Sequence, residues 1–145
     1  MRRGELLPAH AGARENAHPA DGQRYTGRGR VDRLDEALDL YRASTLGERR
    51  PVDDRAIFAD MIRHANLTVT AWDGALLVGI SRSLTDFSYV CYLADLAVRT
   101  SHQKAGIGRE LIARTRDALG PRAMIVLLAA PAAVEYYPKL GFTQH

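Results

Sequence analysis

The sequence predicts an α/β protein with a mixed, mostly antiparallel central sheet and helices on both faces. Three features lead to this prediction. A strand-like run over 92–98 enters a glycine loop over 103–108, and a helix-like run leaves it. The dipeptide Asp73-Gly74 separates two further strand-like runs and is typical of a tight hairpin turn. Apolar residues at helical spacing flank these strands, so helices are expected to cover the sheet.

Two helices are expected before the hairpin. Apolar residues at i, i+4 and i+7 predict a helix over 32–44. A second apolar stripe, which includes Ile57, predicts a helix over 53–66 with Asp53 as its capping residue. A short, weak edge strand over 25–31 precedes both helices.

The remaining elements follow from turn signals and apolar runs. The run over 124–130 is continuously apolar, which is typical of a buried central strand. Pro131 suits the first turn of a further helix, and the strand–loop–helix–strand segment before it predicts a right-handed crossover between parallel strands. The expected order is β-α-α-β-β-β-α-β-α-β, with the later strands at 67–72, 75–83, 89–98, 124–130 and from 142, and the later helices at 108–119 and 131–140.

Composition divides the chain into a basic tail and a neutral body. Residues 1–24 are rich in Ala, Gly, Pro, His and Arg without apolar periodicity, which predicts a disordered tail before one domain over 25–145. The first 30 residues contain six arginines and three acidic residues, so they account for the whole formal net charge of +3. The body therefore has no global field that would attract nucleic acid, and no nucleic-acid partner is expected.

Several classes of protein are disfavoured by what the sequence lacks. No apolar run approaches the roughly 20 residues of a membrane helix, so no membrane association is expected. The five histidines and the single cysteine show no metal-ligand spacing, so no metal is expected. Cys91 cannot form an internal disulfide, and no export signal is visible, which predicts a cytoplasmic protein.

The glycine loop, Gln103-Lys104-Ala105-Gly106-Ile107-Gly108, is the strongest functional feature. Two glycines let the backbone turn tightly and approach a ligand closely. The helix after the loop directs unpaired N–H groups and its positive dipole end toward it, which suits a phosphate. The spacing fits neither the dinucleotide fingerprint nor the Walker loop. The glycines alone are equally consistent with a plain strand-to-helix turn.

This loop resembles the pyrophosphate loop of the GNAT acetyltransferase superfamily, Arg/Gln-x-x-Gly-x-Gly/Ala, which lies between a strand and a helix. The apolar strand over 95–98 that enters it is similar too. A second segment, Tyr136-Tyr137-Pro138-Lys139-Leu140-Gly141-Phe142, resembles the family's aromatic-Tyr-x-x-Leu-Gly-Phe element. The two motifs stand in the family's order, and the expected elements agree over 25–145, so the resemblance implies a GNAT-like fold.

The resemblance implies acetyl-CoA as co-substrate and a primary amine of a small molecule or peptide as acceptor. Tyr137 would lie near the thioester sulfur as the catalytic residue. A phenol with a pKa of about 10 is protonated at neutral pH and can protonate a departing thiolate, whose usual pKa is about 8.5. Tyr136 is interpreted as structural, because adjacent helical residues face different directions. The residues implied to bind acetyl-CoA are Leu96, Ala97, Val98, Gln103, Lys104, Ala105, Gly106, Ile107, Gly108 and Arg109.

The general base is not recognisable in the sequence, because Tyr92 stands where many family members have a glutamate. Asp95 is in the same strand, but by alternation it faces the side opposite Leu96 and Val98. The proton of the acceptor amine would then leave to solvent or along a chain of water. The residues that could contact the acceptor are Asp86, Arg49, Arg50 and Tyr92; the two arginines could instead bind a carboxylate or the 3′-phosphate of the co-substrate.

Two questions stay open at this level. The family's last strand would follow Phe142, and the sequence has three residues after it. Either the chain is truncated there, or a second protomer of a homodimer supplies the missing strand to an open sheet edge. Because the strand glutamate is absent, a non-catalytic domain that binds or senses acyl-CoA is the alternative function.

Overall fold

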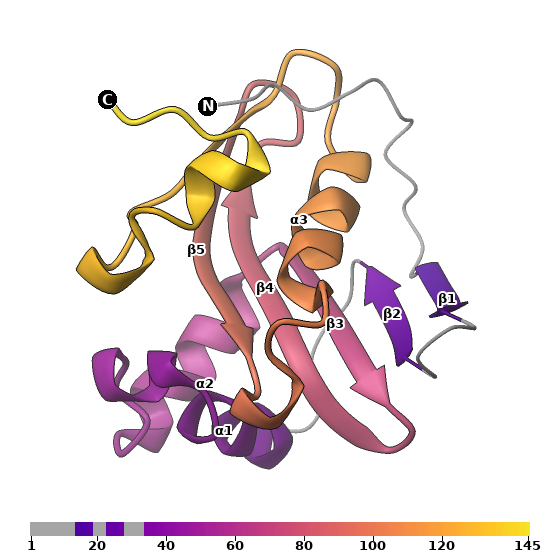
Figure 1. The fold of residues 1–145 in the computed structure, drawn as a ribbon. Coiled ribbons are helices and arrows are strands. Elements are labelled where there is room, and N and C mark those ends of the chain that lie inside the picture. The colour runs from indigo at the N-terminus through magenta and orange to yellow at the C-terminus, as the bar shows by residue number, and fades with distance from the viewer. Residues whose placement is uncertain (1–13, 19–22, 28–33) are drawn as a thin grey trace.

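A six-stranded sheet, in the order β1-β2-β3-β4-β5-β6, forms the centre of the molecule (Figure 1). The computed structural model describes residues 14–18, 23–27 and 34–145. Neighbouring strands are antiparallel except β5 and β6, which are parallel, so the predicted mixed, mostly antiparallel sheet is confirmed. The strands are β1 (Arg14–His18), β2 (Gln23–Gly27), β3 (Leu67–Asp73), β4 (Leu76–Thr85), β5 (Val90–Val98) and β6 (Met124–Val126).

Helices cover both faces of the sheet, as predicted. They are α1 (Leu34–Arg42), α2 (Arg55–His64) and α3 (Ile107–Asp117), with the short 3-10 helices η1 (Thr45–Arg49), η2 (Thr100–His102), η3 (Pro131–Ala133) and η4 (Tyr137–Leu140). On one face, Tyr41 of α1 and Phe58 of α2 share a buried cluster with Ile80 of β4. On the other face, Leu111 of α3 packs against Val69 of β3, and α3 crosses in front of the sheet in Figure 1.

A β-bulge in β5 decides which of its side chains share a face. The pairing with β4 shifts between Arg82 and Ser83, which leaves Ala94 as an extra residue. Tyr92 and Asp95 therefore lie on the same face, toward α1 and α2, although three positions separate them and a regular strand would place them on opposite faces.

The sheet opens between β5 and β6. The two strands pair only over residues 90–92 and 124–126. A bulge bends its strand and increases the local twist, and beyond the paired residues β5 and the C-terminal segment separate (Figure 1). Among the described residues, no strand pairs with this side of β5 from residue 93 onward. The backbone of that edge is therefore available to a ligand.

The C-terminal segment differs from the prediction. β6 ends at Val126 instead of residue 130, residues 131–140 form η3 and η4 instead of one α-helix, and no strand forms over 142–145. Pro138 explains the missing helix, because it has no N–H for the carbonyl of residue 134 and its ring would clash there. Leu128 is 82% exposed, so the apolar run is not a buried central strand throughout.

Smaller corrections concern the first half of the chain. β1 lies within 1–24, the segment predicted to be a disordered tail, and pairs antiparallel with β2; the boundary at residue 24 stays a prediction. β2 overlaps the predicted edge strand in part, and residues 1–13, 19–22 and 28–33 lie outside the described residues. Asp54, not Asp53, caps α2 by accepting a hydrogen bond from the N–H of Ile57. The Ile57 side chain belongs to no apolar stripe, since it is exposed.

Candidate active site

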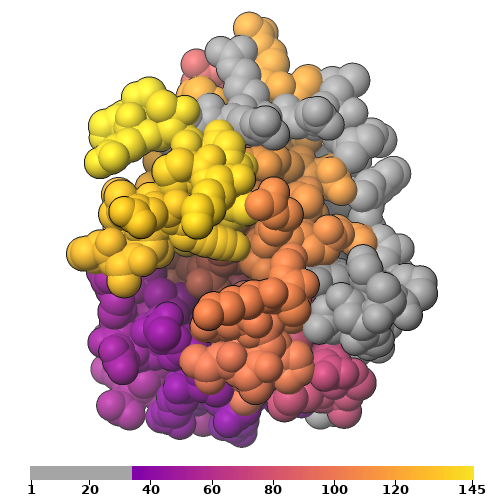
Figure 2. All heavy atoms as spheres, in the orientation of Figure 1, coloured from indigo at the N-terminus to yellow at the C-terminus, as the bar shows by residue number. Residues whose placement is uncertain are grey.

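A cavity of about 410 Å³ lies where β5 and β6 part. Its wall combines the end of β5 over 96–98, the glycine loop with the start of α3, residues 44–46 after α1, and four residues of the C-terminal segment. Figure 2 shows this face of the molecule, which is hollowed between the yellow C-terminal segment, the orange loop and the purple α1 region. Three segments that are far apart in the sequence therefore meet around one hollow.

The glycine loop has the backbone of an anion cradle. Lys104 and Gly106 have φ angles of 64° and 84°. Gly106 is the N-cap of α3 and provides no side-chain cap. The N–H groups of the first turn of α3 have no acceptor inside the helix, and the positive end of the helix dipole lies there. Because Gly106, Ile107 and Gly108 all line the cavity, a phosphate in it would meet these donors.

The two glycines of the loop are favoured for different reasons. A Cβ on Gly106 would have no atom within 4 Å, so only its left-handed backbone favours glycine. A Cβ on Gly108 would stand 2.7 Å from the hydroxyl oxygen of Tyr136, so here the lack of space favours glycine. Tyr136, whose hydroxyl occupies this space beside Gly108, also lines the cavity. Its interpretation as a structural residue assumed a continuous helix, which Pro138 prevents.

Tyr137 lines the same cavity and begins η4. Its ring packs edge-to-face on Tyr136 and on Phe142, with ring centroids 5.3 Å and 5.7 Å apart. Burial raises the pKa of Tyr137, the neighbouring phenol of Tyr136 raises it further, and the positive charge of Arg50 opposes the rise. The phenol is therefore protonated at neutral pH and can donate a proton or a hydrogen bond.

A buried ion-pair network lies on the face of β5 that α1 and α2 cover. Oδ2 of Asp95 accepts hydrogen bonds from the Tyr41 hydroxyl at 2.7 Å and from Nε of Arg82 at 2.5 Å, and Oδ1 accepts one from Nε of Arg50 at 2.6 Å. Burial by itself would raise the pKa of Asp95, but Arg82, Tyr41 and Arg50 together hold it below its usual value. Asp95 is therefore an ionised anchor and not a general base.

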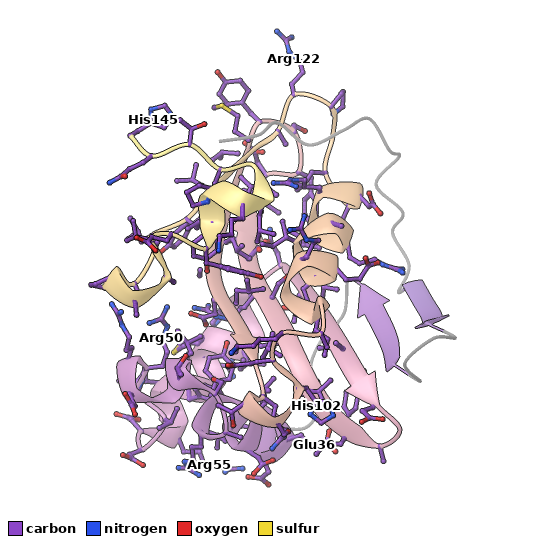
Figure 3. All side chains as sticks on the ribbon, viewed as in Figure 1. Glu36, Arg50, Arg55, His102, Arg122 and His145 are labelled. Carbon is purple, nitrogen blue, oxygen red and sulfur yellow. The ribbon has the colours of Figure 1, made fainter. Side chains whose placement is uncertain are left out.

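Arg50 joins this network to the region of the cavity. Its Nη2 donates to the carbonyl of Ala94 at 3.0 Å, and its Nη1 donates to the carbonyl of Arg49 at 2.8 Å. Figure 3 shows Arg50 between the α1–α2 layer and the C-terminal segment. The sequence could not reveal this arrangement, because Asp95, Arg82 and Arg50 come from separate elements. Two arginines around one carboxylate leave an excess positive charge beside Tyr137.

Two residues at the far end of β5 are already bonded within the protein. Nε2 of Gln103 donates to the carbonyl of Val98 at 3.1 Å, and the backbone N–H of Gln103 closes a turn onto Thr100. His102 also lines the cavity, and it was not recognised in the sequence. Its Nε2 lies 2.8 Å from Oδ2 of Asp73, and Figure 3 places it beside the β3–β4 hairpin. Both side chains are therefore hydrogen-bonded within the protein, and Nδ1 of His102 also lies 2.7 Å from the hydroxyl oxygen of Ser101.

Six of the site residues named in the sequence analysis do not line the cavity: Ala105, Arg109, Asp86, Tyr92, Arg49 and Arg50. Ala105 and Arg109 belong to the loop and to α3 but are absent from the cavity wall. Oδ1 of Asp86 accepts the backbone N–H groups of residues 88–90, which lowers the pKa of Asp86 and fixes the β4–β5 loop. Tyr92 is 38% exposed on the α1–α2 face. The structure does not bring Asp86 or Tyr92 to the two tyrosines.

Residues 48–145 match the acetyltransferase (GNAT) domain family. This match covers more than half of the chain, and the fold and the cavity agree with it. The chain therefore belongs to the GNAT acetyltransferase family, whose members use acetyl-CoA. No curated protein sequence matches this chain.

Solved structures support the same fold. An inferred acetyltransferase from Deinococcus radiodurans R1 superposes with a TM-score of 0.70 at 20% identity, over 91% of this chain and 89% of that one. A GNAT family acetyltransferase from Streptococcus pneumoniae TIGR4 has a TM-score of 0.57 at 24% identity, with 82% and 87% covered. An aminoglycoside N-acetyltransferase in complex with CoA has a TM-score of 0.65 at 17% identity, with 86% and 91% covered. At such identities the likeness concerns the fold.

Two further observations concern the described part of the chain only. Within it, no three or more His, Cys, Asp or Glu side chains are grouped so that they could hold a metal ion. None of its helices combines the length and the apolar character needed to cross a membrane.

Proposed function

We propose that this chain transfers an acetyl group from acetyl-CoA to a primary amine of a small molecule or peptide. The supporting observation is one cavity that is lined both by the anion cradle at the start of α3 and by the protonated phenol of Tyr137. Acetyl-CoA supplies an activated acyl group, so that a C–N bond to the acceptor replaces the C–S bond. The acceptor nitrogen loses a proton, and the leaving sulfur takes one up.

The chain's own groups would divide the binding of acetyl-CoA between two walls. The backbone N–H groups at the start of α3, near Gly106 and Gly108, would hold the phosphates. The open edge of β5 over 96–98 would pair with the amide-containing arm as an added strand would. The carbonyl of Val98 is already bonded to Gln103, so the other backbone groups of this edge remain for the ligand.

Tyr137 would donate its proton to the departing sulfur. The cavity wall, as far as the chain is described, contains no Asp or Glu side chain, and Asp95 is held in its ion-pair network. The acceptor amine would therefore lose its proton to solvent, either before or during the attack. With this arrangement, we expect the acceptor to bind mainly as a neutral amine.

The charges around the cavity bear on the choice of acceptor. Lys104 lines the wall, and Arg50 lies beside Tyr137, so an acceptor with several positive charges would be repelled. A soil-metagenome aminoglycoside acetyltransferase of similar fold has been solved with sisomicin. For this chain we favour an amine without further positive charges, such as that of an amino acid or peptide.

Calorimetric titration with acetyl-CoA and with CoA tests the binding step. Micromolar binding is expected, and Gly106→Glu should abolish it, because the new carboxylate would enter the anion cradle with an unfavourable backbone angle. A panel of amino acids, peptides and aminoglycosides, assayed with wild type and with Tyr137→Phe, then tests transfer. A folded wild-type chain that binds neither ligand would refute the proposal.

A non-catalytic acyl-CoA sensor is the second candidate. The lack of a carboxylate in the described cavity wall favours it. The two candidates differ in one measurement: a sensor binds acetyl-CoA but releases no CoA with any amine of the panel, whereas an enzyme turns over and depends on Tyr137.

A further inference from the structure

Tyr136 directs its hydroxyl at the first turn of α3. The hydroxyl oxygen is 2.7 Å from the place that a Cβ on Gly108 would occupy, whereas the ring carbon Cζ is 3.8 Å from it. Gly108 is the second residue of α3 and lines the cavity. The oxygen atom of Tyr136 therefore lies beside the N–H groups of the anion cradle, and it reaches them from the C-terminal segment on the other wall.

The hydroxyl of Tyr136 is ready to donate a hydrogen bond. Within the residues that the structure describes, no hydrogen bond engages it. Burial raises the pKa of Tyr136, and the positive charge of Arg109 opposes the rise, so the group is protonated at neutral pH. The O–H of Tyr136 and the unpaired N–H groups beside it are all hydrogen-bond donors. A ligand with several acceptor atoms, such as a phosphate, could accept hydrogen bonds from all of them.

We propose that Tyr136 is a ligand of the diphosphate group of acetyl-CoA, to which its O–H donates a hydrogen bond. This assignment rests on the proposed function and deepens it. The backbone of α3 and the side chain of Tyr136 would then hold the diphosphate from two walls of the cavity. Because Tyr136 also packs edge-to-face on Tyr137 with ring centroids 5.3 Å apart, phosphate binding fixes the ring against which Tyr137 rests.

The test compares a ligand that contains the diphosphate with one that lacks it. Wild type and Tyr136→Phe are titrated with CoA and with S-acetyl-pantetheine, which has the reactive arm without the nucleotide. We expect Tyr136→Phe to weaken CoA about tenfold, at the low end for a lost hydrogen bond to a charged acceptor, and to leave S-acetyl-pantetheine unchanged. Tyr89→Phe is the matched control, because Tyr89 is exposed outside the cavity and should change neither affinity.

Kinetics give a second readout. With acetyl-CoA, Tyr136→Phe should raise KM and leave kcat nearly unchanged, as loss of uniform binding does. Equal CoA affinity in the folded variant and wild type would overturn the assignment alone. Equal weakening of both ligands would also overturn it, since the residue would then act on the arm or on the fold. A wild-type chain that binds no CoA would overturn the assignment together with the proposed function.

Discussion

The contact between Gly108 and Tyr136 predicts that substitutions at these two positions are coupled in stability. In wild type, a methyl group at position 108 would stand 2.7 Å from the Tyr136 hydroxyl. Inserting a methyl group into filled space costs about 1–3 kcal/mol, and the lower end applies because Tyr136 is 36% exposed and can turn outward. Replacing glycine by alanine in a helix gains about 0.5–1 kcal/mol. Gly108→Ala alone should therefore change the stability of wild type little or lower it slightly.

In a Tyr136→Phe background the same substitution should be stabilising. Without the hydroxyl, the nearest remaining atoms to the new methyl group lie 3.8 Å away, which is ordinary contact. The helix gain of about 0.5–1 kcal/mol is then uncompensated, and the coupling between the two changes is about 1 kcal/mol, above the roughly 0.3–0.5 kcal/mol within which independent sites add.

Urea unfolding of the four proteins, followed by circular dichroism, measures this coupling. The matched control repeats the cycle with Tyr137→Phe, whose hydroxyl is not among the atoms close to Gly108, and should give additive effects. If Gly108→Ala has the same effect with Tyr136 and with Phe at position 136, the hydroxyl does not lie where the structure places it, and the reasoning about the loop fails.

Tyr137→Phe is expected to lower kcat by about 10²-fold or more through loss of proton donation without changing the dissociation constant of acetyl-CoA; an unchanged single-turnover rate would remove the phenol from the chemistry. The kcat/KM of wild type should rise with pH along the titration of the acceptor amine and should not fall until above about pH 10, the usual phenol value, because burial raises the pKa of Tyr137; a falling limb near neutral pH would contradict this. Asp95→Asn should destabilise the fold by about 3–5 kcal/mol, since it leaves the buried charge of Arg82 unpaired, as urea unfolding can show. The folded-state pKa of Asp95 is lowered, so its ionised carboxylate contributes fully to the free energy of unfolding of wild type above about pH 4, and this contribution is lost as the pH falls further. If the stability of Asp95→Asn fell with acid as steeply as that of wild type, the stabilising role of the Asp95 carboxylate would be contradicted. Gly106→Ala should cost about 1–2 kcal/mol, from the left-handed backbone alone, and a neutral result would mean that the loop relaxes.

Much of the fold could be predicted because its signals are local. The hairpin at Asp73-Gly74, the apolar stripes of α1 and the start of α3 after Gly106 each depend on residues within a few positions of one another. The sequence also placed Asp95 correctly on the face opposite Leu96. The prediction for the C-terminal segment was wrong for a local reason as well. Pro138 lies within the expected helix over 131–140 and prevents a continuous α-helix there.

The site could be predicted only where its residues are adjacent in the sequence. The cradle around Gly106 and the position of Tyr137 follow from two continuous motifs, and both line one cavity. The network around Asp95 could not be foreseen, because Tyr41, Arg82 and Arg50 reach it across 54, 13 and 45 positions. The contact of Tyr136 with Gly108 depends on how the C-terminal segment folds back, which no pattern in the sequence specifies.

The brevity of the β5–β6 ladder has a consequence for how the molecule moves. The three residue pairs at 90–92 are the only strand pairing between the described C-terminal segment and the sheet. Beyond it, the N–H of Met124 donates to the carbonyl of Tyr89, Arg116 donates to the carbonyl of Leu140, and side chains such as Phe142 pack on the core. Segments held in this way open more easily than the core of a sheet. A ligand in the cavity would contact both β5 and the C-terminal segment and so hold them together. Amide hydrogen exchange over 127–142 should therefore slow on binding far more than exchange in β3 and β4. Bound acetyl-CoA would then stabilise the packing of the segment that carries Tyr136 and Tyr137, the same residues that would bind it and act on it.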